Sequence, residues 1–218
     1  ESKMTAIFFD LDGTLTDPKE GITKSIQFAL KKMGKKVPDT EELLWCIGPP
    51  LRNSFAELLG EESRVEEAIS LYRERFSEVG LYENTLYRGI TDLLAELKRN
   101  NFILYVATSK PHIYATKIIQ HFELDQYFEE IFGSEIDGAR SDKSELLSYA
   151  LSKVGCDPRN SYMVGDRKHD AIGAINNNMM PVGVLYGYGS KEELEEAGVH
   201  QFAEKTPREI LKLVQVSF

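Results

Sequence analysis

Short, uninterrupted apolar runs bounded by turn residues constrain the fold of this chain most strongly. They occupy residues 4–9, 102–107, 162–164 and 181–185. Strands of a parallel sheet are covered on both faces, so they read as continuous apolar runs rather than as alternating patterns. Helix-period patterns lie between the later runs, at residues 90–99, 112–121, 142–154 and 170–176. This alternation predicts an α/β fold with a doubly wound parallel sheet.

One long segment, residues 18–87, interrupts the alternation with three successive helix-period stripes and no strand. The stripes comprise Ile22, Ile26, Ala29, Leu30 and Met33; Leu51, Phe55, Leu58 and Leu59; and Val65, Ala68, Ile69, Tyr72, Phe76 and Val79. A crossover between parallel strands needs only about a dozen residues. We therefore predict an all-helical domain of residues 18–82, with these stripes as its core, inserted into a core domain of residues 1–17 and 83–218.

Charge and hydropathy exclude several classes of partner. With 26 Lys and Arg against 35 Asp and Glu, the net charge is −9, which argues against binding of nucleic-acid polymers because these require a basic face. No stretch is apolar for long enough to predict a membrane span, and residues 1–4 lead into a strand rather than a signal peptide. Two cysteines without paired ligands indicate neither a disulfide framework nor a zinc site. We expect a cytoplasmic protein, as a monomer or a homodimer.

Two aspartates follow the first predicted strand. Asp10 and Asp12 leave the strand end on the same side, and Gly13 allows a sharp turn after them. Ligands of open α/β sheets bind at the carboxyl ends of strands, so one carboxylate could act as a nucleophile and the other as a general acid and base. The alternative is a simple strand-to-turn junction with two solvated aspartates.

Hydroxyl and ammonium groups follow two further elements. Thr108 and Ser109 come after the second predicted strand, where hydroxyls and free amides could bind an anionic oxygen, although they could equally cap the next helix. Lys143 opens a later helix, with Asp142 or Ser141 as its natural cap. A lysine in a first helical turn opposes the helix dipole, which favours an anion-binding role over that of an ordinary surface lysine.

Asp166 and Asp170 lie at the end of the strand predicted at residues 162–164. Carboxylate oxygens gathered from two strand ends form a site for a hard cation, and together with a substrate phosphate and waters they suit octahedral Mg²⁺. Asp170 could instead cap a helix that begins at Ala171.

Taken in order, these groups resemble the four motifs of the haloacid dehalogenase superfamily, and the inserted helices resemble its mobile cap. The matching residues are Asp10, Asp12, Gly13 and Thr14; Thr108 and Ser109; Lys143; and Gly165, Asp166 and Asp170. The resemblance spans residues 4 to about 190. Each motif also occurs in its expected structural context, which makes the combination specific.

The resemblance implies a role for each residue. Asp10 matches the nucleophile that becomes an aspartyl phosphate, and Asp12 matches the acid and base that serves the leaving group and then the water. The dehalogenase branch lacks this second aspartate, which disfavours carbon–halogen chemistry. Thr108 and Lys143 match ligands of the phosphoryl oxygens, with the amides of Ser109 and Leu11 nearby.

The same resemblance implies a magnesium site. Asp166 matches a metal ligand, together with the Asp10 carboxylate and the Asp12 carbonyl oxygen. Asp170 matches a second acidic position that reaches the metal through water or supports the site. Because a dianionic ester would be repelled by these aspartates, we expect Mg²⁺ to be obligatory.

Substrate choice is expected to lie in the inserted helices. Residues 47–52 combine a rigid Gly-Pro-Pro turn with Arg52 at a helix start, so Arg52 is the candidate contact to the leaving group. Its alternative is a solvated arginine beside an interhelix turn.

Within the superfamily the pattern is most similar to the phosphoglycolate phosphatase group and its 5′-nucleotidase neighbours. The expected function is hydrolysis of a small phosphorylated metabolite, and nucleoside monophosphates and sugar phosphates are further candidate substrates. A phosphomutase of the same fold and a receiver-like phosphoacceptor are alternatives, although receiver domains are about half this length and lack the helical insertion.

Overall fold

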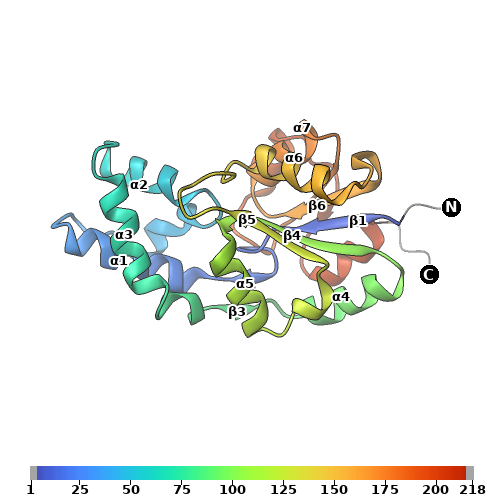
Figure 1. The fold of residues 1–218 in the computed structure, drawn as a ribbon, viewed down its shortest axis with the longest axis horizontal. Coiled ribbons are helices and arrows are strands. Elements are labelled where there is room, and N and C mark those ends of the chain that lie inside the picture. The colour runs from blue at the N-terminus through green and yellow to red at the C-terminus, as the bar shows by residue number, and fades with distance from the viewer. Residues whose placement is uncertain (1–3, 215–218) are drawn as a thin grey trace.

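Six parallel strands form the central sheet in a computed structural model that describes residues 4–214 (Figure 1). Their order is β5-β4-β1-β6-β7-β8, and every neighbouring pair is parallel. The strands are β1 (Ala6–Phe9), β4 (Ile103–Pro111), β5 (Glu130–Ser134), β6 (Ser161–Gly165), β7 (Met180–Val184) and β8 (Phe202–Ala203). The doubly wound α/β fold expected from the sequence is thereby confirmed.

Helices cover both faces of the sheet, as Figure 1 shows. On one face lie α6 (Lys143–Val154) and α7 (Lys168–Asn176), and on the other lie α4 (Ile90–Arg99) and α5 (His112–His121). Successive residues of β1 therefore enter different cores: Phe8 packs with residues of α6, whereas Ile7 and Phe9 pack with residues of α4 and α5. This two-sided burial explains why the strand reads as a continuous apolar run.

The remaining short helices lie along the later part of the chain. They are α8 (Lys191–Glu196), α9 (Ile210–Leu213) and the 3-10 helices η3 (Asp125–Tyr127), η4 (Pro158–Asn160) and η5 (Pro207–Glu209). Helix α9 packs against α4 and β8. Among the described residues, no helix combines the length and apolar character needed to span a bilayer.

A helical segment separates β1 from the rest of the sheet. It contains α1 (Lys19–Lys32), η1 (Thr40–Cys46), α2 (Leu51–Leu59), α3 (Val65–Phe76) and η2 (Gly80–Tyr82). A small antiparallel pair, β2 (Thr16–Asp17) and β3 (Thr85–Leu86), joins its two ends. Figure 1 shows α1, α2 and α3 grouped beyond one end of the sheet. Helix α1 packs on α3, and α3 packs on α2.

Several details differ from the sequence prediction. Strand β3 lies within the segment predicted to contain no strand, and β5 and β8 were not predicted. Val79 was expected in the helical core but is 48% exposed, because α3 ends three residues earlier. Helix α7 begins at Lys168, two residues before the predicted start.

Candidate active site

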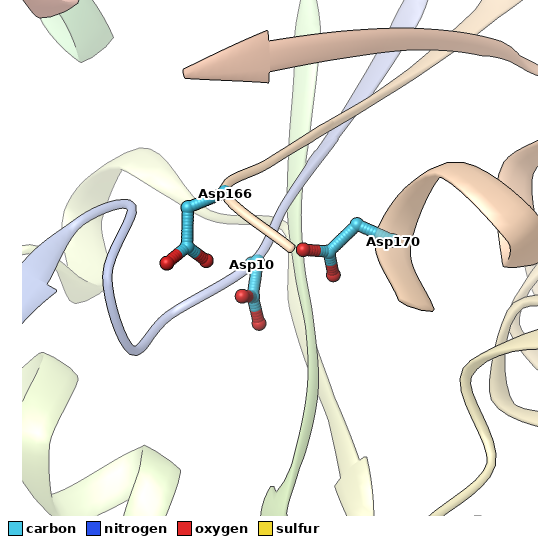
Figure 2. A group of neighbouring side chains, drawn as sticks. All are labelled: Asp10, Asp166 and Asp170. Atoms are coloured by element: carbon cyan, nitrogen blue, oxygen red, sulfur yellow. The ribbon is translucent and has the colours of Figure 1, made fainter. Parts of the chain in front are cut away.

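Three aspartates gather at the carboxyl edge of the sheet, where β1 and β6 end side by side. Asp10 follows β1, Asp166 follows β6, and Asp170 lies in the first turn of α7. One carboxylate oxygen from each lies within 4.8 Å of the others, and all three side chains are buried (Figure 2). Neighbouring parallel strands place their carboxyl ends at one edge, so residues more than 150 positions apart meet here.

The electrostatics of this cluster favour a cation. Burial, together with the charge of Asp170, raises the pKa of Asp10 to about 7, although Lys143 opposes the shift. Burial also raises the pKa of Asp166 well above its usual range, and the charges of Asp10 and Asp170 add to this effect. Buried carboxylates that repel one another are stabilised by a hard divalent cation with oxygen ligands. The donor set of the cluster therefore fits such an ion.

Lys143 contacts two of these three aspartates, Asp10 and Asp170. Its Nζ is 2.8 Å from Asp170 Oδ1 and 3.1 Å from Asp10 Oδ1, and it donates a hydrogen bond of 2.8 Å to the Ala107 carbonyl oxygen. Burial disfavours the charged lysine, but Asp10 and Asp170 outweigh it and hold the pKa of Lys143 above its usual value. The Asp142 carboxylate caps this helix by accepting a hydrogen bond from the Glu145 N–H. A charged ammonium group is thus fixed beside the Asp10 carboxylate.

Asp166 is held by the loops after β1 and β7. Its carboxylate accepts hydrogen bonds from the Tyr188 N–H at 2.8 Å and from the Thr14 hydroxyl at 3.4 Å. Gly13 adopts a positive φ of 84°, and a Cβ atom there would lie 2.1 Å from Asp166 Oδ2. Glycine is therefore required at this position both by backbone conformation and by the approach of Asp166.

Asp170 does not cap a helix beginning at Ala171, as one interpretation of the sequence proposed. Helix α7 starts at Lys168, so Asp170 lies inside its first turn. Its carboxylate accepts a hydrogen bond of 3.1 Å from the Arg167 N–H, in addition to its ion pair with Lys143. Asp170 is thus oriented toward the aspartate cluster from the helix side (Figure 2).

Asp12 belongs to a different group of side chains. Its Oδ2 is 3.1 Å from the Nζ of Lys110, and both side chains are more than nine-tenths buried. Asp12 Oδ1 is buried with no hydrogen-bond partner among the described residues. Lys110 Nζ also lies 4.5 Å from the ring centre of Phe76 in α3. The two aspartates predicted from one strand end therefore enter separate charged clusters.

The hydroxyl groups of Thr108 and Ser109, predicted to follow a strand that ends at residue 107, do not cap the next helix. Strand β4 continues to Pro111, and no side chain caps α5. Thr108 is buried, and its hydroxyl oxygen accepts a hydrogen bond of 3.1 Å from the Lys110 N–H. Ser109 lines a pocket of about 260 Å³ together with Lys143 and His169. The capping alternative is therefore wrong for this pair.

A second pocket, called here the interhelical pocket, lies between the sheet edge and the inserted helices. It has a volume of about 60 Å³. Its lining combines Asp12, Ser109, Lys110, Pro111 and Tyr114 with Ile22, Gly48, Pro49, Leu51, Tyr72, Arg73 and Phe76 from the inserted segment. The turn that begins at Ile47 thus reaches the site, as the sequence indicated. Asp12 is the acidic member of this lining.

Arg52 lies in a neighbouring pocket that also contains Ser109 and Arg73. Its guanidinium forms an ion pair with Glu66 and donates a hydrogen bond of 3.1 Å to the Asp137 carbonyl oxygen. The structure thus brings Arg52 near the site without placing it in the interhelical pocket.

Two buried cations were missed by the sequence reasoning, Lys110 and Arg167. The Arg167 guanidinium donates hydrogen bonds to the carbonyl oxygens of Ile47 (2.7 Å) and Trp45 (3.2 Å), and it pairs with Glu193 of α8 at 3.0 Å. It therefore ties the segment before α2 to the sheet domain. Lys110 follows Thr108 and Ser109 directly, and Arg167 follows Asp166. These positions beside predicted site residues were the only indication in the sequence that the two cations belong to the site.

Comparisons with known proteins identify the family of this chain. The family model described as haloacid dehalogenase-like hydrolase matches residues 7–184. A 5′-nucleotidase from Pseudomonas aeruginosa is 49% identical over 189 residues, 86% of each chain. The solved structure of a predicted phosphatase from Clostridium acetobutylicum is 42% identical, covers 98% of this chain and 99% of that one, and has a TM-score of 0.93. The tyrosine-protein kinase PtkA of Mycobacterium tuberculosis is 40% identical over 87% of this chain, which spans 65% of that protein.

Proposed function

Because the chain belongs to the haloacid dehalogenase-like hydrolase family and is a phosphoric monoester hydrolase, we propose that it hydrolyses a small phosphomonoester through an aspartyl phosphate on Asp10, with Mg²⁺ as its cofactor. One observation carries the proposal. The Asp10 carboxylate lies in a buried cluster with a lysine and two further carboxylates, while Asp12 faces a separate pocket that can hold a leaving group.

The first half-reaction uses both aspartates. A carboxylate oxygen of Asp10 attacks phosphorus, and the bond from phosphorus to the leaving oxygen breaks. Asp12 enters this step in its protonated form and donates its proton to that oxygen, leaving the Asp12 carboxylate. In the second half-reaction, the Asp12 carboxylate takes a proton from a water molecule. That water attacks phosphorus, the bond to Asp10 breaks, and inorganic phosphate is released. The unpartnered Oδ1 of Asp12 supports this role because it is free to accept the proton.

Beyond proton transfer and nucleophilic attack, most of the rate enhancement comes from neutralising the negative charge on the phosphoryl oxygens. We assign the phosphoryl oxygens to the Lys143 ammonium group and the Thr108 hydroxyl, with the amides of Ser109 and Leu11 alongside. Lys143 is suited to this role because it is fixed by three hydrogen-bonded or ionic partners and does not need to reorganise.

Phosphatases of this family generally use a divalent metal, and the aspartate cluster fits one. We propose that Asp10 and Asp166 hold Mg²⁺ with the Asp12 carbonyl oxygen, and that Asp170 acts through water or by holding Lys143. When bound, the ion supplies positive charge to the phosphoryl oxygens. The side chains of this chain then position the reacting carboxylate and the leaving group.

Residues 18–82 are proposed to form a cap domain over a core domain of residues 1–17 and 83–218. The interhelical pocket, which both parts line, supports this division. The core side would handle the phosphoryl group, and the cap side would recognise the leaving group. Arg167 would fasten the cap through its hydrogen bonds to Ile47 and Trp45.

For the substrate we propose a compact ester of the phosphoglycolate type, since the interhelical pocket is small. The second candidate is a nucleoside 5′-monophosphate, because the Pseudomonas aeruginosa relative is named a 5′-nucleotidase. Phosphoryl transfer to a second hydroxyl, as in a phosphomutase, is the remaining alternative.

A panel of phosphomonoesters with Mg²⁺, scored by kcat/KM and by phosphate release, tests the proposal. It includes phosphoglycolate, nucleoside 5′-monophosphates and hexose phosphates. We expect phosphate release to be fastest with phosphoglycolate. Preference for a nucleotide would select the second candidate, and substrate conversion without phosphate release would select the phosphomutase.

A further inference from the structure

Two positively charged side chains line the interhelical pocket, and only one of them is paired with a carboxylate among the described residues. Lys110 lies on the core side, where Asp12 neutralises it at 3.1 Å. Arg73 comes from α3 on the opposite wall. Within residues 4–214, no carboxylate forms an ion pair with the Arg73 guanidinium, and no hydrogen bond joins it to another residue. Arg73 thus brings an uncompensated positive charge to this pocket.

Arg73 differs in this respect from the other arginines around the site. Arg52 is paired with Glu66, and Arg167 is paired with Glu193. Burial lowers the pKa of Arg73, and the nearby charge of Arg52 lowers it further. A half-buried guanidinium beside a second arginine is electrostatically unfavourable unless an anion approaches it. No acidic side chain of the described chain supplies that anion.

From this arrangement we infer that Arg73 binds a second anionic group, a carboxylate or a phosphate, on the leaving group of the substrate. This inference rests on the proposed function, because it requires the phosphoryl group to lie at Asp10 and the leaving group to extend past Asp12 into the interhelical pocket. The guanidinium presents paired N–H donors that match the geometry of carboxylate and phosphate oxygens.

The size of the interhelical pocket limits which leaving groups it can hold. A volume of about 60 Å³ has room for only a few water molecules. A two-carbon acid approaches that size, whereas a nucleoside would require the inserted helices to move away. The aromatic residues Tyr72, Phe76 and Tyr114 line the pocket around the cation. They reduce its hydration, which strengthens a charge-assisted hydrogen bond to the ligand.

The test compares Arg73→Gln with wild type on three phosphate compounds that differ in the charge of the leaving group. The leaving groups of phosphoglycolate and inorganic pyrophosphate carry a carboxylate and a phosphate, respectively. The leaving group of phenyl phosphate is phenol, which carries neither. We expect Arg73→Gln to lower kcat/KM about 10- to 100-fold for at least one of the first two. Its effect on phenyl phosphate should stay within about threefold, since no charge-assisted bond is lost there.

Two further variants separate the loss of the Arg73 charge from a general effect of substitution on the structure. Arg73→Lys keeps the charge and should recover part of the lost kcat/KM, which a purely structural role would not predict. Arg64→Gln is the matched control, because Arg64 is a partly exposed residue that immediately precedes α3, pairs with Glu67 and does not line the pocket. It should leave all three substrates unchanged. Thermal denaturation of each variant establishes that it is folded.

The outcomes separate the inference from the proposed function. An equal loss of kcat/KM on all three substrates, or no loss on any, would overturn the role of Arg73 alone. Turnover of phenyl phosphate by wild type, with neither of the other two hydrolysed, would also overturn it and leave the phosphatase intact. A wild-type protein that hydrolyses no phosphomonoester would overturn the proposed function, and this inference with it.

Discussion

Two buried lysine–aspartate clusters flank the end of β1, and they are built differently. Lys143, Asp10 and Asp170 all belong to the sheet and its flanking helices, and the Ala107 carbonyl oxygen completes the cluster. The pair of Lys110 and Asp12 is instead covered by Phe76 of α3. The ion pairs and the hydrogen bond that fix the first cluster therefore come from the sheet and its flanking helices. The second pair is instead in contact with a side chain of the inserted helices.

We propose that this difference reflects a division of labour within one site. Burying a charge pair contributes little net stability, because the loss of hydration offsets the attraction. Two such clusters side by side are consequently better explained by function than by folding. The Lys143 cluster suits the phosphoryl group, which all substrates share. The Lys110 pair suits the leaving group, which varies among substrates.

The largest expected effect comes from the first cluster. Asp10→Asn removes the proposed nucleophile, so kcat should fall by about 10⁴-fold or more while the protein stays folded. Steady-state phosphate release and circular dichroism measure the two quantities. Asp92→Asn, an exposed substitution in the first turn of α4, is the control and should be fully active. Normal turnover by the Asp10 variant would remove that residue from the nucleophilic role.

Removal of divalent cations probes the same cluster without a mutation. Asp10, Asp166 and Asp170 would then face a dianionic ester with no divalent cation to offset their charge, although Lys143 still pairs with Asp10 and Asp170. Turnover by EDTA-treated protein should fall by about 10³-fold or more. Adding Mg²⁺ back should restore it. Full activity after chelation would show that this cluster works without a metal.

Asp12→Asn tests the second cluster and should have a smaller effect that depends on the leaving group. Loss of a general acid lowers kcat by about 10²- to 10⁴-fold when the leaving alcohol is basic. The loss should shrink for p-nitrophenyl phosphate, whose leaving group departs without a proton. Comparing kcat/KM, which reports the phosphoryl-transfer half-reaction, for an alkyl and an aryl ester measures this. An equal loss of kcat/KM for both would argue that Asp12 does not protonate the leaving group.

Arg52→Ala should have the smallest effect. The Arg52 guanidinium already forms an ion pair with Glu66, whose side chain is exposed. Solvent-exposed ion pairs contribute little interaction energy. We expect kcat/KM to change by less than about fivefold on every ester. A larger loss confined to one substrate would instead make Arg52 the leaving-group contact that the sequence predicts.

The sequence predicted well those features that depend on local periodicity and on strand ends. The predicted bounds of α4 and α5 are those found in the structure, because each helix has a clear apolar period and defined ends. Asp10 and Asp166 could be expected to meet, because both follow buried strands of one parallel sheet. Asp142 and Ser141 were both candidate caps for the helix that begins at Lys143, and in the structure Asp142 is the cap.

Other features depended on tertiary contacts that local patterns do not encode. Strand β5 has Glu, Gly and Ser among its five residues, so no continuous apolar run marks it. The pairing of Lys110 with Asp12 joins positions 98 residues apart, from residue 12 to residue 110. Lysines are usually exposed, and nothing in the sequence marked this one as buried. The lack of an acidic partner for Arg73 is likewise visible only after folding.

Trapping the covalent intermediate tests the central claim most directly. The wild-type protein is mixed with a phosphomonoester and Mg²⁺, quenched in acid and reduced with borohydride, which converts an aspartyl phosphate to homoserine. Peptide mass spectrometry then locates the modified residue. The mechanism proposed here predicts homoserine at position 10 and only in samples that received substrate. Modification at Asp12, Asp166 or Asp170, or an unmodified Asp10 during rapid turnover, would contradict it.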